Sequence, residues 1–199
     1  VRIKDITYDV SKPIININSP LTNDYINDYF ISYDISENIS KGEVLWERTG
    51  GEDDPNFIHN QVMNSSELEE KEFFLKALSD SISLVNGSIY SLSILATDFA
   101  GNTSRSKIIK NLKYDSIKPS IIADGIKNND FINKMGFNYI LSENVMTGTI
   151  IWESNNDDSL LINILSEDEL NEGSVFIDEF NDKINLVDGV SYNISMFVV

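Results

Sequence analysis

An internal repeat is the feature of this sequence that most constrains its fold. Segments of the first half recur 106 residues later, and beyond the tryptophans the offset falls to 102. A deletion of four residues in a loop accounts for the change. A period near 100 residues is too long for a solenoid and predicts separate domains, each with its own core. The matched segments are Tyr8-Asp9 and Tyr114-Asp115, Lys12-Pro13 and Lys118-Pro119, Ser36-Glu37-Asn38 and Ser142-Glu143-Asn144, Trp46-Glu47 and Trp152-Glu153, and Tyr90 and Tyr192.

The repeat also sets the expected domain boundaries. Ile3-Lys4-Asp5-Ile6-Thr7-Tyr8 matches Ile109-Lys110-Asn111-Leu112-Lys113-Tyr114, so residues 1–8 are predicted to be the last strand of a preceding repeat. Residues 9–114 form repeat 1. Residues 115–199 are expected to form repeat 2, truncated before its final hairpin and strand. The chain does not start with methionine, so the absence of a signal peptide from this segment carries no conclusion.

Apolar residues alternate along several short segments, which is the pattern of half-buried strands. Tyr90, Leu92, Ile94 and Ala96 form one inward set, mirrored by Tyr192, Ile194, Met196 and Val198. Turn residues divide these segments, and no amphipathic helix lies between them. The sequence therefore predicts an all-β fold of tandem immunoglobulin-like (Greek-key) β-sandwich domains. Further inward sets are Ile31, Tyr33 and Ile35, Val44 and Trp46, and Ile150 and Trp152.

Two local patterns refine this prediction. Residues 64–68 and 166–170 each have a capping residue followed three positions later by a glutamate, a pattern that starts a helix. We predict a single turn in each segment, with the side chain of Leu68 or Leu170 packed into the core. Leu84-x-x-Gly87-x-x-Tyr90 and Leu186-x-x-Gly189-x-x-Tyr192 look like tyrosine corners, in which the phenol bonds back to the backbone.

With these motifs the chain resembles the bacterial immunoglobulin-like repeats of large surface and adhesin-type proteins. Domains of that family commonly open with Asp-x-x-x-Pro and close with Asp-x-Ala-Gly-Asn, as Asp9 to Pro13, Asp115 to Pro119 and Asp98 to Asn102 do here. The resemblance covers essentially the whole chain. It implies a stalk or adhesive segment outside the cell or at the cell surface.

Charge and residue content exclude several functions. The net charge of −17 repels phosphate, so nucleic acid is not an expected partner. There is no cysteine, which rules out disulfides and thiolate chemistry. No apolar run is long enough to insert into a membrane. His59 is the single histidine, is expected in a polar loop, and has no counterpart in the sister repeat, so we predict that the chain is not an enzyme.

Calcium is the strongest chemical candidate, although no cofactor is required. Calcium takes six to eight oxygen ligands, and Asp98, Asn102 and Asp115 could converge where one repeat meets the next. The resemblance implies such sites, because related repeats hold calcium at their junctions. The favoured alternative is a tight hairpin in which Gly101 has positive φ and Asp98 accepts hydrogen bonds from nearby amides. The acidic runs Glu52-Asp53-Asp54 and Asp157-Asp158 are expected to be solvated loops.

Two functions remain open at this point. The first is a structural or adhesive module whose partners are neighbouring repeats and surface glycans or proteins of a host or the environment. The second is a glycan-binding accessory module of an exported enzyme. Most aromatic residues fall on the inward phase of strands, where core packing explains them better than a sugar-binding platform.

Overall fold

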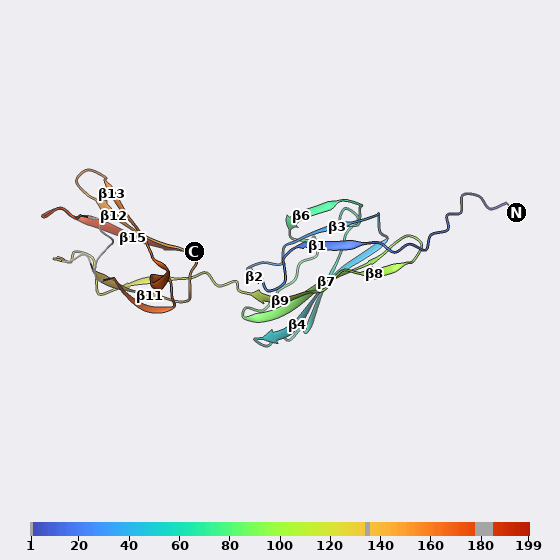
Figure 1. Cartoon of the computed structure of the whole chain (residues 1–199), viewed down its shortest axis with the longest axis horizontal. Helices are drawn as coiled ribbons and strands as arrows, with labels where there is room; N and C mark the ends of the chain where they lie inside the picture. The colour runs from blue at the N-terminus through green and yellow to red at the C-terminus, as the bar shows by residue number, and fades with distance from the viewer. Residues whose placement is uncertain (1, 134–135, 178–184) are drawn as a thin grey trace. The chain divides into compact units, whose positions relative to one another are not determined.

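The computed structural model of the chain describes residues 2–133, 136–177 and 185–199. It divides into two compact units, unit 1 (Val1–Ile117) and unit 2 (Lys118–Val199), whose regular secondary structure is almost entirely strand (Figure 1). The all-β prediction is confirmed. The strands of unit 1 are β1 (Ile15–Ser19), β2 (Tyr25–Ile26), β3 (Ile31–Ile35), β4 (Lys41–Gly51), β5 (Ile58–Val62), β6 (Glu72–Lys76), β7 (Ser88–Thr97), β8 (Thr103–Arg105) and β9 (Ile109–Tyr114). Those of unit 2 are β10 (Ile121–Asp124), β11 (Phe137–Leu141), β12 (Gly148–Ser154), β13 (Leu160–Ile164), β14 (Gly173–Ile177) and β15 (Tyr192–Val198).

Unit 1 is a two-layer sandwich. One sheet has the order β1-β3-β6, and the other has the order β2-β9-β7-β4-β5, with β8 added to β7. The chain changes sheet between β3 and β4 and again on either side of β6. This is the strand arrangement of immunoglobulin-like sandwiches, in which the two sheets pack their inner faces together.

Unit 2 repeats this plan with fewer strands in its described residues. Its sheets have the orders β10-β11-β14 and β13-β12-β15. The register also repeats, because Trp46 lies opposite His59 and Leu92 in unit 1, whereas Trp152 lies opposite Leu161 and Ile194 in unit 2. The pairing of β12 is shorter than that of β4, whose final residues, Thr49 to Gly51, have no strand counterpart in unit 2.

Each unit has its own hydrophobic core. Trp46 is 0% exposed and packs within a cluster drawn from both sheets of unit 1, and Trp152 is 1% exposed within a separate cluster in unit 2. The alternation read from the sequence explains why, since consecutive side chains of a strand point to opposite faces. Every inward residue predicted for repeat 1 is buried, whereas Tyr192, Ile194, Met196 and Val198 of repeat 2 are only partly buried.

The two local patterns take their expected contacts with one difference in secondary structure. The Tyr90 hydroxyl accepts a hydrogen bond from Val85 N (2.9 Å) and that of Tyr192 accepts one from Val187 N (3.0 Å), as in a tyrosine corner. Glu167–Glu169 forms a 3₁₀ turn, η1, with the reciprocal capping bonds. Asn64 and Glu67 make the same bonds, and residues 65–67 form the predicted single turn, without regular helix.

Residues 2–14, all within the described part of the chain, form no strand. The interpretation of residues 1–8 as the strand of a preceding repeat, and the boundaries at 9, 114 and 115, stay predictions. No helix within the described ranges is both long and apolar enough to span a bilayer.

Candidate metal centre

The turn after β7 is built around the Asp98 carboxylate. Asn102 donates to it twice, from its backbone N–H to Oδ1 and from its side-chain amide to Oδ2, both at 2.8 Å. Asp98 N also donates to Asn102 O (3.1 Å), and Gly101 has a φ of 93°. A positive φ is the conformation that glycine adopts most easily. These are the contacts expected of the hairpin alternative, and they leave Asp98 2% exposed.

The opening segment of unit 1 is tied to this turn. The Asn102 side-chain amide donates to the Asp9 carbonyl (3.2 Å), and the Ser104 hydroxyl donates to the Pro13 carbonyl (2.5 Å). The motif that opens the repeat therefore meets the motif that closes it. Asp9, Glu37 and Asp98 each bring a carboxylate oxygen to within 4.8 Å of the others, and we call these three residues the acidic cluster.

The Ser-Glu-Asn trio explains how Glu37 reaches the cluster. The Ser36 hydroxyl accepts from Ile14 N (2.9 Å), and the Asn38 side-chain oxygen accepts from Glu70 N (2.6 Å). Ser36 and Asn38 therefore stabilise the turn, and Glu37 between them contributes its carboxylate to the acidic cluster. Unit 2 has the same two bonds, from Ser120 N to the Ser142 hydroxyl (2.8 Å) and from Glu172 N to the Asn144 side chain (2.7 Å).

The carboxylates of the cluster differ in their electrostatics. Burial opposes ionisation of Asp98, but hydrogen bonds from Asn102 and from the backbone of the turn outweigh it and lower the pKa of Asp98. The pKa of Glu37 is raised, first by desolvation and then by the negative charges of Asp9, Asp98 and Glu70. Adding positive charge here would therefore relieve repulsion.

The structure does not bring Asp115 to Asp98 and Asn102. β9 runs antiparallel to β7, with Lys113 opposite Ile89, so Asp115 lies at the end where β7 begins, whereas Asp98 lies where it ends. The ten residues of β7 separate the two ends by about 30 Å. Order along the sequence suggested that a closing motif meets the next opening motif. In fact the closing motif folds back onto the opening motif of its own repeat.

Asp115 instead donates its N–H to the Ile26 carbonyl (2.8 Å), and its side chain accepts from Ile117 N (3.1 Å). By the repeat offset it corresponds to Asp9, and Glu143 corresponds to Glu37. A calcium ion in unit 1 would therefore take oxygens from Asp9, Glu37 and Asp98. Calcium binding itself stays a prediction, because acidic groups also cluster on surfaces without any ion.

We expect millimolar calcium to raise the melting temperature of unit 1 by binding the folded state alone. Glu37→Gln should abolish that increase and, with chelator present, should make unit 1 slightly more stable than wild type, because it removes a repelled charge. Glu47→Gln, on exposed β4 surface, is the matched control. Calorimetry would contradict calcium binding if the ion had no effect, or if both variants responded like the wild type.

A second buried polar group surrounds His59. His59 lies on β5 and not in a loop, and Asp54 is buried rather than solvated, so both expectations from the sequence are wrong. His59 Nε2 lies 2.6 Å from Asp54 Oδ2, and the Tyr90 hydroxyl donates to the same oxygen at 2.6 Å. Asn56 N donates to Asp54 Oδ1 (2.9 Å). The tyrosine corner of unit 1 is therefore extended into a hydrogen-bonded network, which we call the Asp54 network.

The internal repeat carried the signal that could have identified this network. The four-residue deletion shortens the hairpin that carries Asp54, and the position opposite Trp152 is Leu161 instead of histidine. A histidine that is present only in the repeat with the longer hairpin indicates a contact between the histidine and that hairpin. His59 also makes an edge contact with Tyr90 at 6.0 Å between ring centroids.

Comparison with known proteins adds little to this description. No family model matches the chain, and no curated protein matches it. Among solved structures it is similar to a segment of two fibronectin type-III domains from chicken tenascin, with 12% identity, a TM-score of 0.35, and coverage of 94% of this chain and 90% of that one. A likeness this weak carries no functional argument, and the fold assignment rests on the strands described above.

Proposed function

We propose that the chain is a structural or adhesive segment of a long bacterial cell-surface or secreted protein, in which immunoglobulin-like repeats follow one another as a stalk. The observation that carries the proposal is that the two units have separate cores and the same internal plan. Such units can be added without changing those already present, so length is gained by repetition. Its partners are then neighbouring repeats and surface glycans or proteins outside the cell.

The pairing of β2 with β9 supports a load-bearing role. β2 belongs to the N-terminal part of the unit 1 sequence and β9 to its C-terminal part. The two strands run parallel, with Tyr25 opposite Lys113. Asn23 N donates to Lys110 O and Lys113 N donates to Asp24 O, both at 3.0 Å, and Asp115 N donates to Ile26 O at 2.8 Å. Pulling the ends apart would load these bonds in shear, so that they must break together. Unit 1 is therefore suited to resisting extension.

Pulling single molecules of the chain tests this proposal. We expect unit 1 to unfold in one event, and Lys113→Pro to lower its unfolding force because proline has no N–H to donate to Asp24. Lys113→Ala is the matched control, since it keeps that bond and removes only the side-chain contact with Tyr25. If both variants unfolded at the wild-type force, the pairing of β2 with β9 would not bear load.

The flanking gene sequence provides a separate test. A stalk requires further copies of the Asp-x-x-x-Pro and Asp-x-Ala-Gly-Asn motifs at a spacing near 100 residues. A neighbouring catalytic domain with no further copies would instead favour the accessory glycan-binding module.

A further inference from the structure

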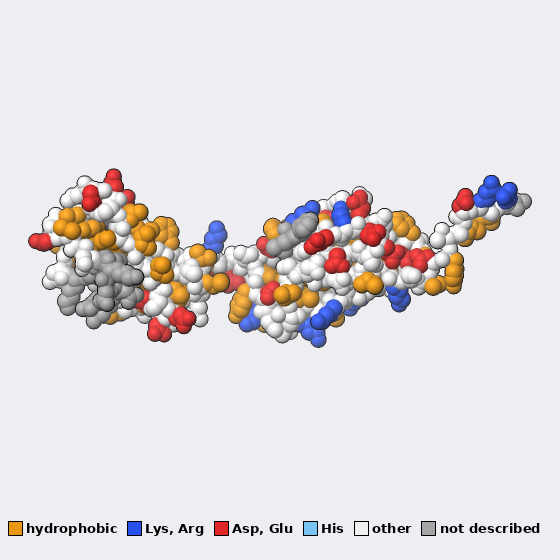
Figure 2. Space-filling model, turned by 45° about the horizontal axis from the view of Figure 1, so that its top comes forward, with side chains coloured by type: hydrophobic (Ala, Val, Ile, Leu, Met, Phe, Trp, Pro, Cys, Tyr) orange, Lys and Arg blue, Asp and Glu red, His pale blue; other side chains and the backbone are white. Residues whose placement is uncertain are grey.

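β13 in unit 2 carries a stripe of exposed apolar side chains. It is the end strand in the order β13-β12-β15, and its Leu161 and Asn163 point towards the core. Alternate residues of a strand face opposite ways, so the residues between and beside them lie on the outer face of the sheet. They are Leu160 (54% exposed), Ile162 (55%) and Ile164 (71%). Figure 2 shows hydrophobic side chains gathered over the upper part of unit 2, where Figure 1 labels β13.

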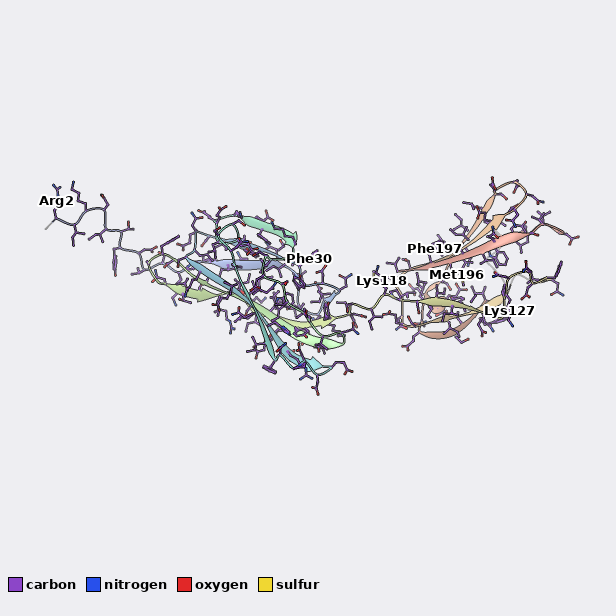
Figure 3. All side chains as sticks on the ribbon, turned by 180° about the vertical axis from the view of Figure 1, so that it is seen from behind. Arg2, Phe30, Lys118, Lys127, Met196 and Phe197 are labelled. Carbon is purple, nitrogen blue, oxygen red and sulfur yellow. The ribbon has the colours of Figure 1, made fainter. Side chains whose placement is uncertain are left out.

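The same outer face continues onto β12. Ile151 lies directly opposite Ile162 in the pairing of β12 with β13, so their side chains are neighbours on one face. Figure 3 labels two residues of β15 that mark the faces of this sheet: Met196 packs against the core, and Phe197 is exposed on the other side. The outer patch of unit 2 is defined here as Leu160, Ile162, Ile164 and Ile151.

Unit 1 has an equivalent outer patch, formed by Ile58 and Val62 of β5 and Leu45 of β4. Ile58 and Val62 are 53% and 56% exposed, and Leu45 lies between them on the same face, opposite Asn60. β8 and β9 are present on the other side of this sheet, yet the patch stays exposed. Its exposure therefore does not depend on where the sequence begins or ends. The repeat offsets match Ile58, Val62 and Leu45 to Leu160, Ile164 and Ile151.

The two strands that carry these patches contain no Asp, Glu, Lys or Arg residue. Both are end strands of their sheets, in a chain of which 24% of the residues are charged. Exposed edge strands commonly carry charged side chains, which keep other chains away. An exposed apolar surface that recurs in both units and lacks this protection is typical of a contact surface.

Addition of a further strand to β5 is blocked in unit 1. The Val62 N–H, which would donate to an added strand, donates to the Asp80 carboxylate (2.8 Å). The Gln61 side-chain amide donates to the Asp80 carbonyl (2.6 Å), so this residue lies along the edge of β5. A partner is left with the outer face of the sheet. The contact is therefore made by side chains, as when one sheet packs on another.

The size and the recurrence of the patches indicate what covers them. A stable interface covers about 800 Å² of each partner, and a patch of three or four side chains is smaller than this. Two patches on one chain reinforce each other when both are engaged, because the second contact then forms at a high effective concentration. Such a partner must itself offer apolar patches in successive repeats. A second copy of the chain meets this requirement.

We propose that the outer patches bind the outer patches of a second copy of this chain, with the sheets packed face to face. Both copies contribute the same surface, so the contact closes on itself as a pair. Each copy has a net charge of −17, so the copies repel each other, and salt strengthens the pair by screening that repulsion. The proposal does not rest on the stalk function, which the pulling experiment and the flanking sequence test separately.

Sedimentation velocity of the full chain, with chelator present, tests the pairing. The wild type should form dimers whose fraction rises with protein concentration and with sodium chloride. The double variant Val62→Lys, Ile164→Lys should raise the dissociation constant at least about 100-fold, because each copy would bury two unpaired ammonium groups. The two lysines reduce the net charge from −17 to −15, so the general repulsion between copies falls and does not explain the loss.

The matched control is Ile14→Lys, Ile122→Lys, which should dimerise at least as well as the wild type. It makes the same change of charge at isoleucines that are 64% and 60% exposed, one just before β1 and one in β10, away from the outer patches. All four side chains are more than half exposed, so both variants should fold, as circular dichroism would check. Should the patch variant melt below the wild type, Val62→Thr, Ile164→Thr is the milder change and should weaken dimerisation about 10-fold.

Amide signals measured by NMR then locate the contact. As the protein concentration rises, the signals of Ile58–Val62 and Leu160–Ile164 should shift, whereas those of Ile121–Asp124 should not. The proposal is overturned if the wild type stays monomeric up to about 1 mM, if the lysine variant pairs as the wild type does, or if the shifts fall on other strands. Association that weakens with salt would indicate ion pairs between the copies and would also overturn it.

Discussion

Trp46→Ala is expected to lower the free energy of unfolding of unit 1 by about 3–5 kcal/mol, and Trp152→Ala to do the same to unit 2. Both indoles are fully buried, at 0% and 1% exposed, in the centres of their cores. Truncation removes a large apolar surface from each core and leaves a cavity. Trp46 in addition donates to the Gln61 side chain (2.9 Å), which the truncation leaves with one fewer partner.

The chain has two tryptophans, one in each unit, which makes the measurement selective. In Trp46→Ala the remaining fluorescence comes from Trp152 and should report an unchanged unfolding midpoint for unit 2, while circular dichroism records the loss in unit 1. The losses should add in the double variant, because the two cores share no residue. Should a variant fail to fold, Trp46→Phe and Trp152→Phe provide milder losses. A shift of both midpoints by one substitution would contradict separate cores.

Asp54→Asn is expected to destabilise unit 1 by about 3 kcal/mol and to leave unit 2 unaffected. The Asp54 carboxylate is buried and is shared by His59, Tyr90 and the Asn56 N–H. An amide has only one oxygen to serve these three groups, so at least one buried polar atom loses its partner. Asp53→Asn is the matched control: its side chain is fully exposed and forms an ion pair with Arg48 at 2.8 Å, so removing the same charge there should have little effect.

The same network predicts how stability depends on pH. Burial alone would raise the pKa of Asp54, but the hydrogen bonds from His59, Tyr90 and Asn56 outweigh it and lower the pKa. A carboxyl whose folded pKa is lowered stabilises the fold above its unfolded pKa, about 3.9, and loses that contribution as pH falls through the folded value. Acid denaturation of unit 1 below about pH 4 should therefore be less steep in Asp54→Asn. An identical acid transition in variant and wild type would exclude Asp54 as its source.

In the candidate metal centre, the sequence predicted the contact between residues close in the chain but not the contacts between distant residues. Asp98 and Asn102 were identified from a motif whose residues are close in the chain, and they are in contact. Asp9 and Glu37 were each part of a recognised repeat, but nothing in their spacing indicates that they meet Asp98. Asp115 was grouped with Asp98 because it follows in the sequence, and the antiparallel course of β7 and β9 places it at the opposite end.

The sequence by itself determined the features that depend on local pattern. Period-two alternation specified which residues of β3, β4 and β7 face the core, and the repeat specified that Trp46 and Trp152 are equivalent. The tyrosine corners followed in the same way, because their hydrogen bonds join residues only five apart. Such features are encoded locally, since strand geometry and short turns fix them.

Only the tertiary structure decided which distant segments meet. The contact of Asn102 with Asp9 spans 93 residues, and the bond between Tyr90 and Asp54 spans 36. Contacts across such long loops form only when whole sheets pack together. Which residues meet therefore depends on the tertiary fold and not on the local sequence.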